Sequence, residues 1–184
     1  RPDASARHDQ PYGPMRARAM MSLPRSIGTL ARWLGPWAES SQSPDVAIVD
    51  ERLDVRGDRR GDRRANDGDH PLRVRLYRPH GLRAGDERAA YLIAPGLHYA
   101  GPDDPRMDRF CRILAAAGHL VIAPFIPSYL DLLPRRAAIE DFERVFDARA
   151  RWTNKKPVVF SISFGSLLAF ALAALGLLAS DKRL

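Results

Sequence analysis

The chain has 184 residues, of which 45% are apolar and 28% are charged. This length and this balance describe one globular domain, and they argue against a disordered chain or a membrane protein. The formal net charge of +7 comes mainly from arginines that are spread over the whole sequence. The pairs Arg59-Arg60 and Arg63-Arg64 are offset by neighbouring aspartates, so no nucleic-acid partner is expected.

The single cysteine fits a reducing compartment, and the lengths of the apolar runs argue against a secretory signal or a membrane span. The single cysteine, Cys111, cannot form an internal disulfide and falls on a predicted helix, so we interpret it as a small core residue. The first 25 residues lack the continuous apolar stretch of a secretory signal, and the longest apolar run, 167–179, is too short to span a bilayer. We expect a cytoplasmic protein with no membrane span, and the sequence does not indicate its oligomeric state.

The N-terminal segment, residues 1–45, is predicted to be flexible and to contain one short helix. Residues 1–22 combine proline, glycine and charge without periodicity. From Ser26 to Trp37 apolar residues recur at helical spacing, and Gly35-Pro36 ends the pattern. We expect this amphipathic helix to pack on the domain; covering the mouth of a site or lying on a membrane surface are the alternatives.

The domain is expected to begin at residue 46 with two antiparallel strands. Residues 46–55 alternate apolar and charged side chains. From Leu72 to Tyr77 the alternation is more regular: the inner face carries Leu72, Val74 and Leu76, and the face toward water carries Arg73, Arg75 and Tyr77. Between them, glycine and alternating charge over residues 56–69 predict a solvated hairpin loop. Each strand would keep one face in water, at the leading edge of a mixed sheet.

Strands and helices then alternate along the chain. The predicted strands are 89–94, 119–125 and 158–162, and the predicted helices are 104–118, 138–152 and an apolar, buried helix over 167–178. This alternation predicts an α/β fold, with a mostly parallel sheet behind an N-terminal antiparallel hairpin and with helices on both faces.

The turn after the last strand carries the strongest functional signal. It reads Ser161-Ile-Ser-Phe-Gly165 and places Ser163 at the tip of a strand-to-helix turn. A hydroxyl there is pushed clear of the sheet and lies beside helix N-terminal N–H groups that can hold a developing oxyanion. A strand, a tight turn and a buried helix without catalytic function would give the same five-residue pattern.

A second loop, Pro95 to Gly101, follows the strand at 89–94, and its two glycines leave backbone N–H groups accessible. Over roughly residues 46–180 the order and spacing of these parts resemble the α/β-hydrolase superfamily, and specifically its esterases and lipases. The departures are Ser161, where most members carry glycine, and Pro95-Gly96, where many members carry His-Gly.

The resemblance implies a role for each matching residue and no cofactor or metal ion. Ser163 would be the acyl-accepting nucleophile, and the backbone N–H groups of Phe164 and Leu97 would form the oxyanion hole. Gly96, His98 and Tyr99 would line the substrate pocket. The implied substrate is a small carboxylic ester, although a thioester or an amide would suit the same chemistry.

The resemblance also implies an acid and a histidine after the nucleophile. Only 21 residues follow Ser163; they contain one acid, Asp181, and no histidine. His98 is interpreted as a pocket residue rather than a base. Such a fold also implies further strands after this turn; without them the strand at 158–162 becomes an exposed sheet edge and the helix over 167–178 loses part of its cover. We therefore expect residues 46–184 to be the N-terminal part of a hydrolase core, from a longer protein or a decayed gene, and to be inactive as given. The alternative is a non-catalytic binding or interaction module on the same fold.

Overall fold

The computed structural model describes residues 43–54, 70–83 and 85–176. The helix predicted over residues 26–37 and the loop predicted over 56–69 lie outside these ranges. Within them, no helix is long and apolar enough to cross a membrane.

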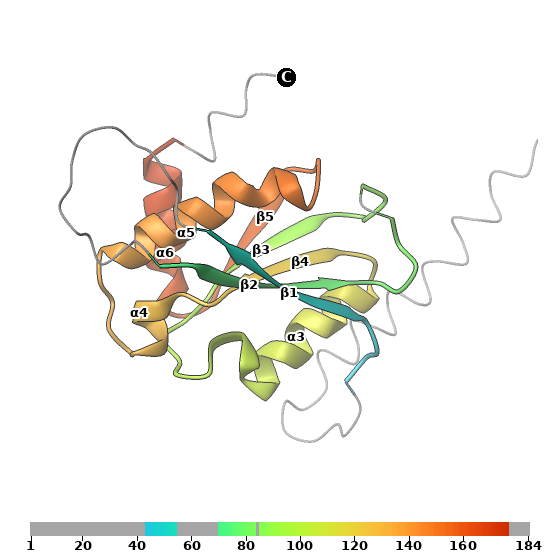
Figure 1. Cartoon of the computed structure of the whole chain (residues 1–184), viewed down its shortest axis with the longest axis horizontal. Coiled ribbons are helices and arrows are strands. Elements are labelled where there is room, and N and C mark those ends of the chain that lie inside the picture. Colours follow the sequence, from blue (N-terminus) through green and yellow to red (C-terminus); the bar gives the residue numbers. More distant parts are fainter. Residues whose placement is uncertain (1–42, 55–69, 84, 177–184) are drawn as a thin grey trace, which may run out of the picture.

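Five strands form one sheet in the order β1-β2-β4-β3-β5 (Figure 1). The strands are β1 (Ala47–Leu53), β2 (Leu72–Arg78), β3 (Ala90–Ala94), β4 (Leu120–Pro124) and β5 (Pro157–Ser161). β2 pairs antiparallel with both β1 and β4, whereas β3 pairs parallel with both β4 and β5. Only β2 therefore runs against the others, which confirms the predicted mostly parallel sheet with an N-terminal antiparallel hairpin.

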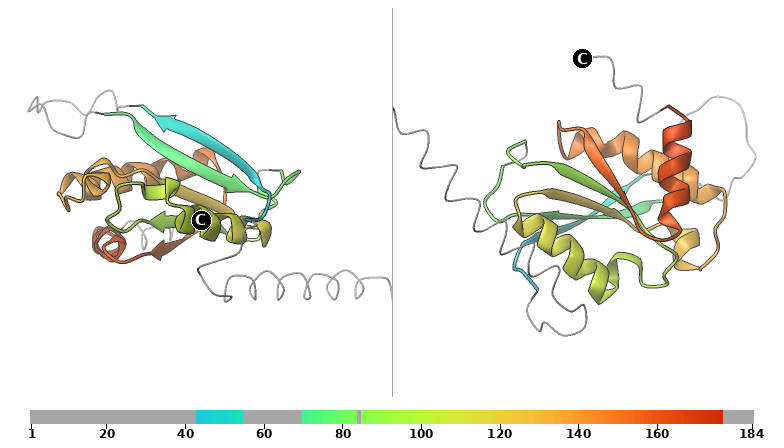
Figure 2. Two further views of the ribbon diagram at one scale, coloured as in Figure 1. Left: turned by 90° about the horizontal axis from the view of Figure 1, so that it is seen from below. Right: turned by 180° about the vertical axis from the view of Figure 1, so that it is seen from behind.

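Helices cover both faces of this sheet, as predicted (Figures 1 and 2). One face packs against α3 (Pro105–Ala116), whose Phe110 and Cys111 meet Ile93 and Val121 of the sheet. The buried, unpaired Cys111 is thus a core residue. The other face packs against α4 (Pro127–Leu130), α5 (Ala137–Ala148) and α6 (Gly165–Ala174). The right-hand view of Figure 2 shows β5 turning sharply into α6.

The first turn of α3 is defined by its cap. The carboxylate of Asp104 accepts hydrogen bonds from the N–H groups of Arg106 and Met107, at 3.0 and 3.3 Å, and Pro105 occupies the first helical position. Such a cap satisfies N–H groups that have no partner within the helix. The helix stops before Gly118, which has a φ of +98°. α4 and the 3₁₀ turn η1 (Gly101–Asp103) were not predicted.

One burial prediction is wrong and another is confirmed. Tyr77, expected on the wet face of β2, is 0% exposed because α3 covers it, and its hydroxyl donates to Asp108 at 3.1 Å. The apolar helix α6 is expected to lose part of its cover, and this is confirmed: it buries Leu168 and Leu172 but leaves Phe170 74% exposed. β5 forms the edge of the sheet, so no described residue covers the outer side of α6.

Candidate active site

The turn between β5 and α6 holds Ser163 in an uncommon backbone conformation. Its φ is +51°, in the left-handed region, where a residue with a Cβ is disfavoured by about 1–2 kcal/mol. Hydrogen bonds fix the turn: Ile162 N donates to Ala94 O at 3.0 Å, and Gly165 N donates to Ile162 O at 2.8 Å. The surrounding backbone therefore imposes the conformation, and the Ser163 side chain is exposed at the tip.

The glycine that follows is required by a close backbone approach. A Cβ at Gly165 would lie 1.9 Å from Ala94 O and 2.7 Å from Pro95 O. These atoms belong to the end of β3 and to the loop after it, and backbone atoms cannot swing aside as a flexible side chain can. The first turn of α6 therefore sits directly against the end of β3.

The loop after β3 lies against the serine. A Cβ at Gly96 would be 3.1 Å from Ile162 O and 3.3 Å from the Cβ of Ser163. This contact brings the backbone after Gly96 close to the turn that carries Ser163. No hydrogen bond between described residues uses the N–H of Leu97 or of Phe164. Both N–H groups are thus available to a ligand beside Ser163.

His98 is held on this loop through both of its ring nitrogens. Nδ1 accepts a hydrogen bond from Ala100 N at 3.2 Å, and Nε2 lies 3.3 Å from Oδ2 of Asp104. The ring also stacks on Tyr99, with 4.7 Å between ring centroids. In this arrangement neither nitrogen is free to take a proton from Ser163. No hydrogen bond between described residues involves the Ser163 hydroxyl.

Asp104 connects the loop to α3. Besides capping the helix, its carboxylate accepts from Nε of Arg106 at 3.1 Å and from Nη2 at 3.2 Å. Burial alone would raise the pKa of Asp104, but the hydrogen bonds from Arg106 and from the N–H of Met107 lower the pKa below its usual 3.8. The carboxylate thus stays ionised and holds His98 and the start of α3 together.

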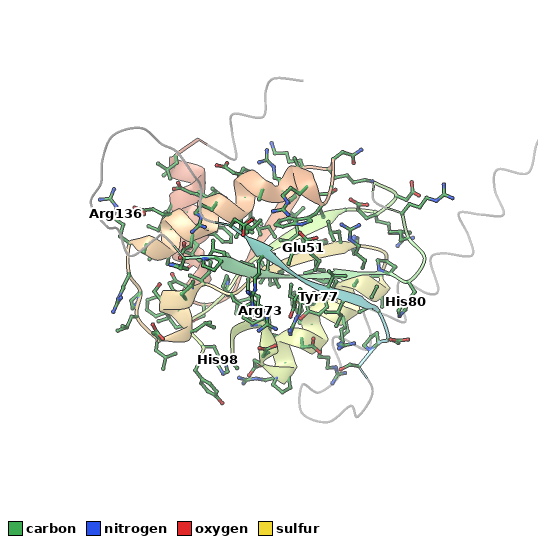
Figure 3. The ribbon with its side chains drawn as sticks, in the orientation of Figure 1. Glu51, Arg73, Tyr77, His80, His98 and Arg136 are labelled. Atoms are coloured by element: carbon green, nitrogen blue, oxygen red, sulfur yellow. The ribbon has the colours of Figure 1, made fainter. Side chains whose placement is uncertain are left out.

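A second acidic residue, Asp103, connects the same loop to the sheet. Arg75 of β2 donates through Nη1 to Oδ1 of Asp103 at 2.6 Å and through Nε to Oδ1 of Asp50 at 2.7 Å. The hydrogen bond from Arg75 is the main reason why the pKa of Asp50 is lowered. Arg73 also reaches Asp103, and its guanidinium lies 4.0 Å from the ring centroid of Phe125. In Figure 3, Arg73 points from β2 toward the N-terminal end of α3, on the side where His98 lies.

Tyr129 of α4 supports the turn from the opposite side. Its side chain is 1% exposed, and its hydroxyl donates to the carbonyl oxygen of Phe164 at 3.3 Å. This hydrogen bond restrains the peptide that joins the turn at Ser163 to α6. Sequence reasoning missed Tyr129 and the ionic network around Asp103. One pair of the network, Asp50 and Arg75, could have been predicted from the opposite charges on the two strands of the expected hairpin. In the structure these two residues lie directly opposite each other in the β1–β2 register.

A pocket of about 540 Å³ opens beside Ser163 between the loop, α3 and β5. Of the predicted site residues it brings together Gly96, Leu97, His98 and Ser163. Phe164 and Tyr99 lie outside its lining and are 51% and 74% exposed. No group of His, Cys, Asp or Glu in the described ranges could hold a metal ion. The lining residues are Pro95, Gly96, Leu97, His98, Gly101, Asp104, Arg106, Met107, Phe110, Phe160, Ser161, Ile162 and Ser163.

No protein-family model and no curated protein matches the sequence. Solved structures do match the fold. Brefeldin A esterase, a bacterial homologue of human hormone-sensitive lipase, aligns with a TM-score of 0.57 at 17% identity, over 90% of this chain and 46% of that one. The hyperthermophilic esterase of Pyrobaculum calidifontis aligns with a TM-score of 0.51 at 21% identity, over 90% and 48%. A cold-adapted esterase from an Arctic intertidal metagenomic library gives 0.52 at 18% identity, over 79% and 60%.

These likenesses define the class of fold. The described residues have an α/β-hydrolase fold of the kind found in esterases and lipases, which confirms the fold expected from the sequence. The chain spans about half the length of the first two structures it matches.

Proposed function

We propose that Ser163 is the nucleophile of a carboxylic-ester hydrolase that works through an acyl-enzyme. The observation that carries the proposal is the left-handed backbone of Ser163, at a turn that Gly165 allows to press against the end of β3. A strained serine at a strand-to-helix turn is the arrangement that exposes a nucleophile in this fold. The matched structures are themselves esterases, which supports an ester as the substrate class.

In the proposed reaction the Ser163 hydroxyl attacks the ester carbonyl carbon and loses its proton to a base. The carbonyl oxygen becomes an oxyanion that accepts hydrogen bonds from the N–H groups of Leu97 and Phe164. The C–O bond to the alcohol then breaks, the alkoxide takes up a proton, and water hydrolyses the acyl-serine. Removing one donor from such a hole costs about 10²–10³ in kcat, so the two N–H groups supply much of the catalysis.

The base and the acid that orients it are proposed to lie outside the described residues. His98 is the one described histidine in the lining of the pocket, and both of its nitrogens are engaged. A serine without a base still gains from an oxyanion hole, which retains about 10³–10⁴ of catalysis over water when triad members are removed. A diffusible base added to the solution should therefore restore part of the missing proton transfer.

Fluorophosphonate labelling with added imidazole tests the proposal. The modified residue is located by peptide mass spectrometry, with Ser163→Ala as the negative variant and Ser166→Ala, on the next turn of the chain, as the matched control. We expect slow labelling of Ser163 that accelerates with imidazole concentration, is lost in Ser163→Ala and persists in Ser166→Ala. A folded sample whose Ser163 stays unlabelled at every imidazole concentration would refute the nucleophile role.

A second candidate function is a non-catalytic binding module on the hydrolase fold. Two observations favour it: both ring nitrogens of His98 already have partners, and the Ser163 hydroxyl has no hydrogen-bond partner among the described residues. In that case Ser163 serves only to form the turn. The same experiment separates the two candidates, because a module predicts no response to imidazole.

A further inference from the structure

The strand β5 is an open edge of the sheet and carries no charged side chain. It pairs with β3 on one side and with no described strand on the other. Its sequence is Pro-Val-Val-Phe-Ser, whereas β1, at the opposite edge, contains Asp50, Glu51 and Arg52. Charged side chains on an edge strand discourage pairing with another chain. The edge at β1 is protected in this way, and the edge at β5 is not.

The unpaired backbone groups of β5 belong to Val159 and Ser161. The N–H of Ile162 donates to a carbonyl oxygen of β3, and the backbone groups of successive residues in a strand point to opposite sides. Phe160 therefore also faces β3, whereas Val159 and Ser161 direct their N–H and C=O groups outward. Pro157 shares the outward orientation and has no N–H to leave unpaired, which is the position that proline takes in an edge strand.

Apolar side chains flank this edge on both faces of the sheet. On the α3 face, Val158 and Phe160 are 50% and 37% exposed. On the other face α6 lies beside β5, and its Leu167 and Phe170 are 45% and 74% exposed (Figure 2). These four side chains present roughly 400 Å² of apolar surface. Two such surfaces, with the strand backbone between them, would bury about 1,000 Å², which is the lower limit for a specific interface.

We propose that β5 pairs antiparallel with β5 of a second copy of this chain, around a two-fold axis at Phe160. A lipid surface would cover the apolar side chains but would leave the N–H and C=O groups of the edge unpaired. A second copy brings an identical edge and satisfies both. Val159 of each copy then lies opposite Ser161 of the other, and four hydrogen bonds use all their outward N–H and C=O groups. Lys155 and Lys156 of the two copies lie at opposite ends of the strand pair, so their charges do not meet.

Pro157 favours this register over its neighbour. A two-fold axis at Val159 would place Pro157 opposite Ser161, whose carbonyl oxygen would then lack a donor, because proline has no N–H. With the axis at Phe160, the two Phe160 side chains face each other on the α3 face, and aromatic cross-strand pairs of this kind stabilise a sheet. Phe160 and Ser161 also line the pocket beside Ser163, so the second copy would form part of the outer wall of that pocket.

Sedimentation velocity of the full chain tests the dimer. We expect a monomer–dimer equilibrium with a dissociation constant in the micromolar range, as an interface of this small size implies. Each copy has a net charge of +7, so added salt should strengthen the dimer by screening the repulsion. Phe160→Lys would place two like charges at the two-fold axis and weaken the dimer by about ten-fold or more. Val49→Lys, at an exposed position of the other edge strand, is the matched control and should dimerise as the parent does. Urea denaturation checks that both variants fold.

Cysteine trapping tests the register. At the two-fold axis the Cα atoms of the two Phe160 residues would lie about 4.5 Å apart, within the span of a disulfide, so Phe160→Cys should give a linked dimer under mild oxidation. Val158→Cys is the control: the two copies of this residue would be about 13 Å apart along the strands and cannot be bridged. The native Cys111 is fully buried and should give no background.

Three results would overturn the proposed pairing. The first is a chain that stays monomeric well above micromolar concentration, including one that sediments with phosphatidylglycerol vesicles instead. The second is a Val158→Cys protein that is linked as fast as Phe160→Cys, and the third is a species larger than a dimer. The inference does not depend on the proposed function. Ser163→Ala should dimerise as the parent does, so the pairing and the role of Ser163 fail separately.

Discussion

Gly165→Ala is the most informative perturbation of the turn at Ser163, because the structure gives the clash directly. The added Cβ would meet Ala94 O at 1.9 Å, Ala94 C at 2.6 Å and Pro95 O at 2.7 Å. An ordinary contact at these atoms needs well over 3 Å, so the end of β3 and the start of α6 would have to separate. The backbone of Gly165 is not left-handed, so the effect is purely steric.

The expected loss in the free energy of unfolding is about 3 kcal/mol or more, at the upper end of what overpacking costs. Alanine at the first turn of a helix offsets about 1 kcal/mol of this through its higher helix propensity. Gly96→Ala provides a graded comparison, since its Cβ would approach Ile162 O to 3.1 Å and needs a shift of only tenths of an ångström. We expect this control to lose about 1 kcal/mol.

Urea denaturation followed by circular dichroism measures both variants, with the slope of the transition checked for constancy. Fluorophosphonate labelling of the folded Gly165→Ala protein should also slow, because separation of the two elements moves the N–H groups of Leu97 and Phe164 apart. A Gly165→Ala protein that unfolds within about 0.5 kcal/mol of the parent would refute the close packing of α6 on the end of β3.

Two further predictions concern the supports of the site. Tyr129→Phe removes the donor to the Phe164 carbonyl at constant ring volume; it should cost about 1 kcal/mol in unfolding free energy and slow imidazole-assisted labelling. Tyr91→Phe, on the face that packs against α3, is the control and should leave labelling unchanged. The pKa of Asp50 is lowered by its hydrogen bond from Arg75, so the stability it provides is fully present above its ordinary pKa of 3.8 and is lost as pH falls through the lower folded-state pKa. Asp50→Asn should reduce the unfolding free energy at pH 7, and the difference from the parent should vanish in acid; a constant difference across that range would contradict the ionic origin.

Sequence patterns predicted the elements of this fold because most of them depend on local periodicity. The apolar runs around Leu92 and Ile122 are buried on both faces, and the Ser161–Gly165 pattern predicts the position of the turn. The supports of the site could not be predicted in this way. Asp103 and Arg75 are 28 residues apart, and Tyr129 and Phe164 are 35 apart, so their contacts arise only once the strands are ordered in the sheet.

The error in the predicted burial of Tyr77 has the same origin. The alternation in β2 distinguishes the two sides of the strand, but it does not show which side a helix covers. It therefore predicts that Tyr77 faces solvent, whereas α3 packs on it in the structure. The partial exposure of α6, in contrast, follows from the sequence, because a core without further strands leaves β5 at the sheet edge and buries only one side of the helix beside it.

The crystal structure of the protein after reaction with a fluorophosphonate tests the central claim most directly. We expect the phosphorus bonded to Oγ of Ser163 and its phosphoryl oxygen about 2.7–3.1 Å from the backbone nitrogens of both Leu97 and Phe164. A phosphoryl oxygen turned toward solvent, with both N–H groups left without an acceptor, would contradict the assignment of the oxyanion hole.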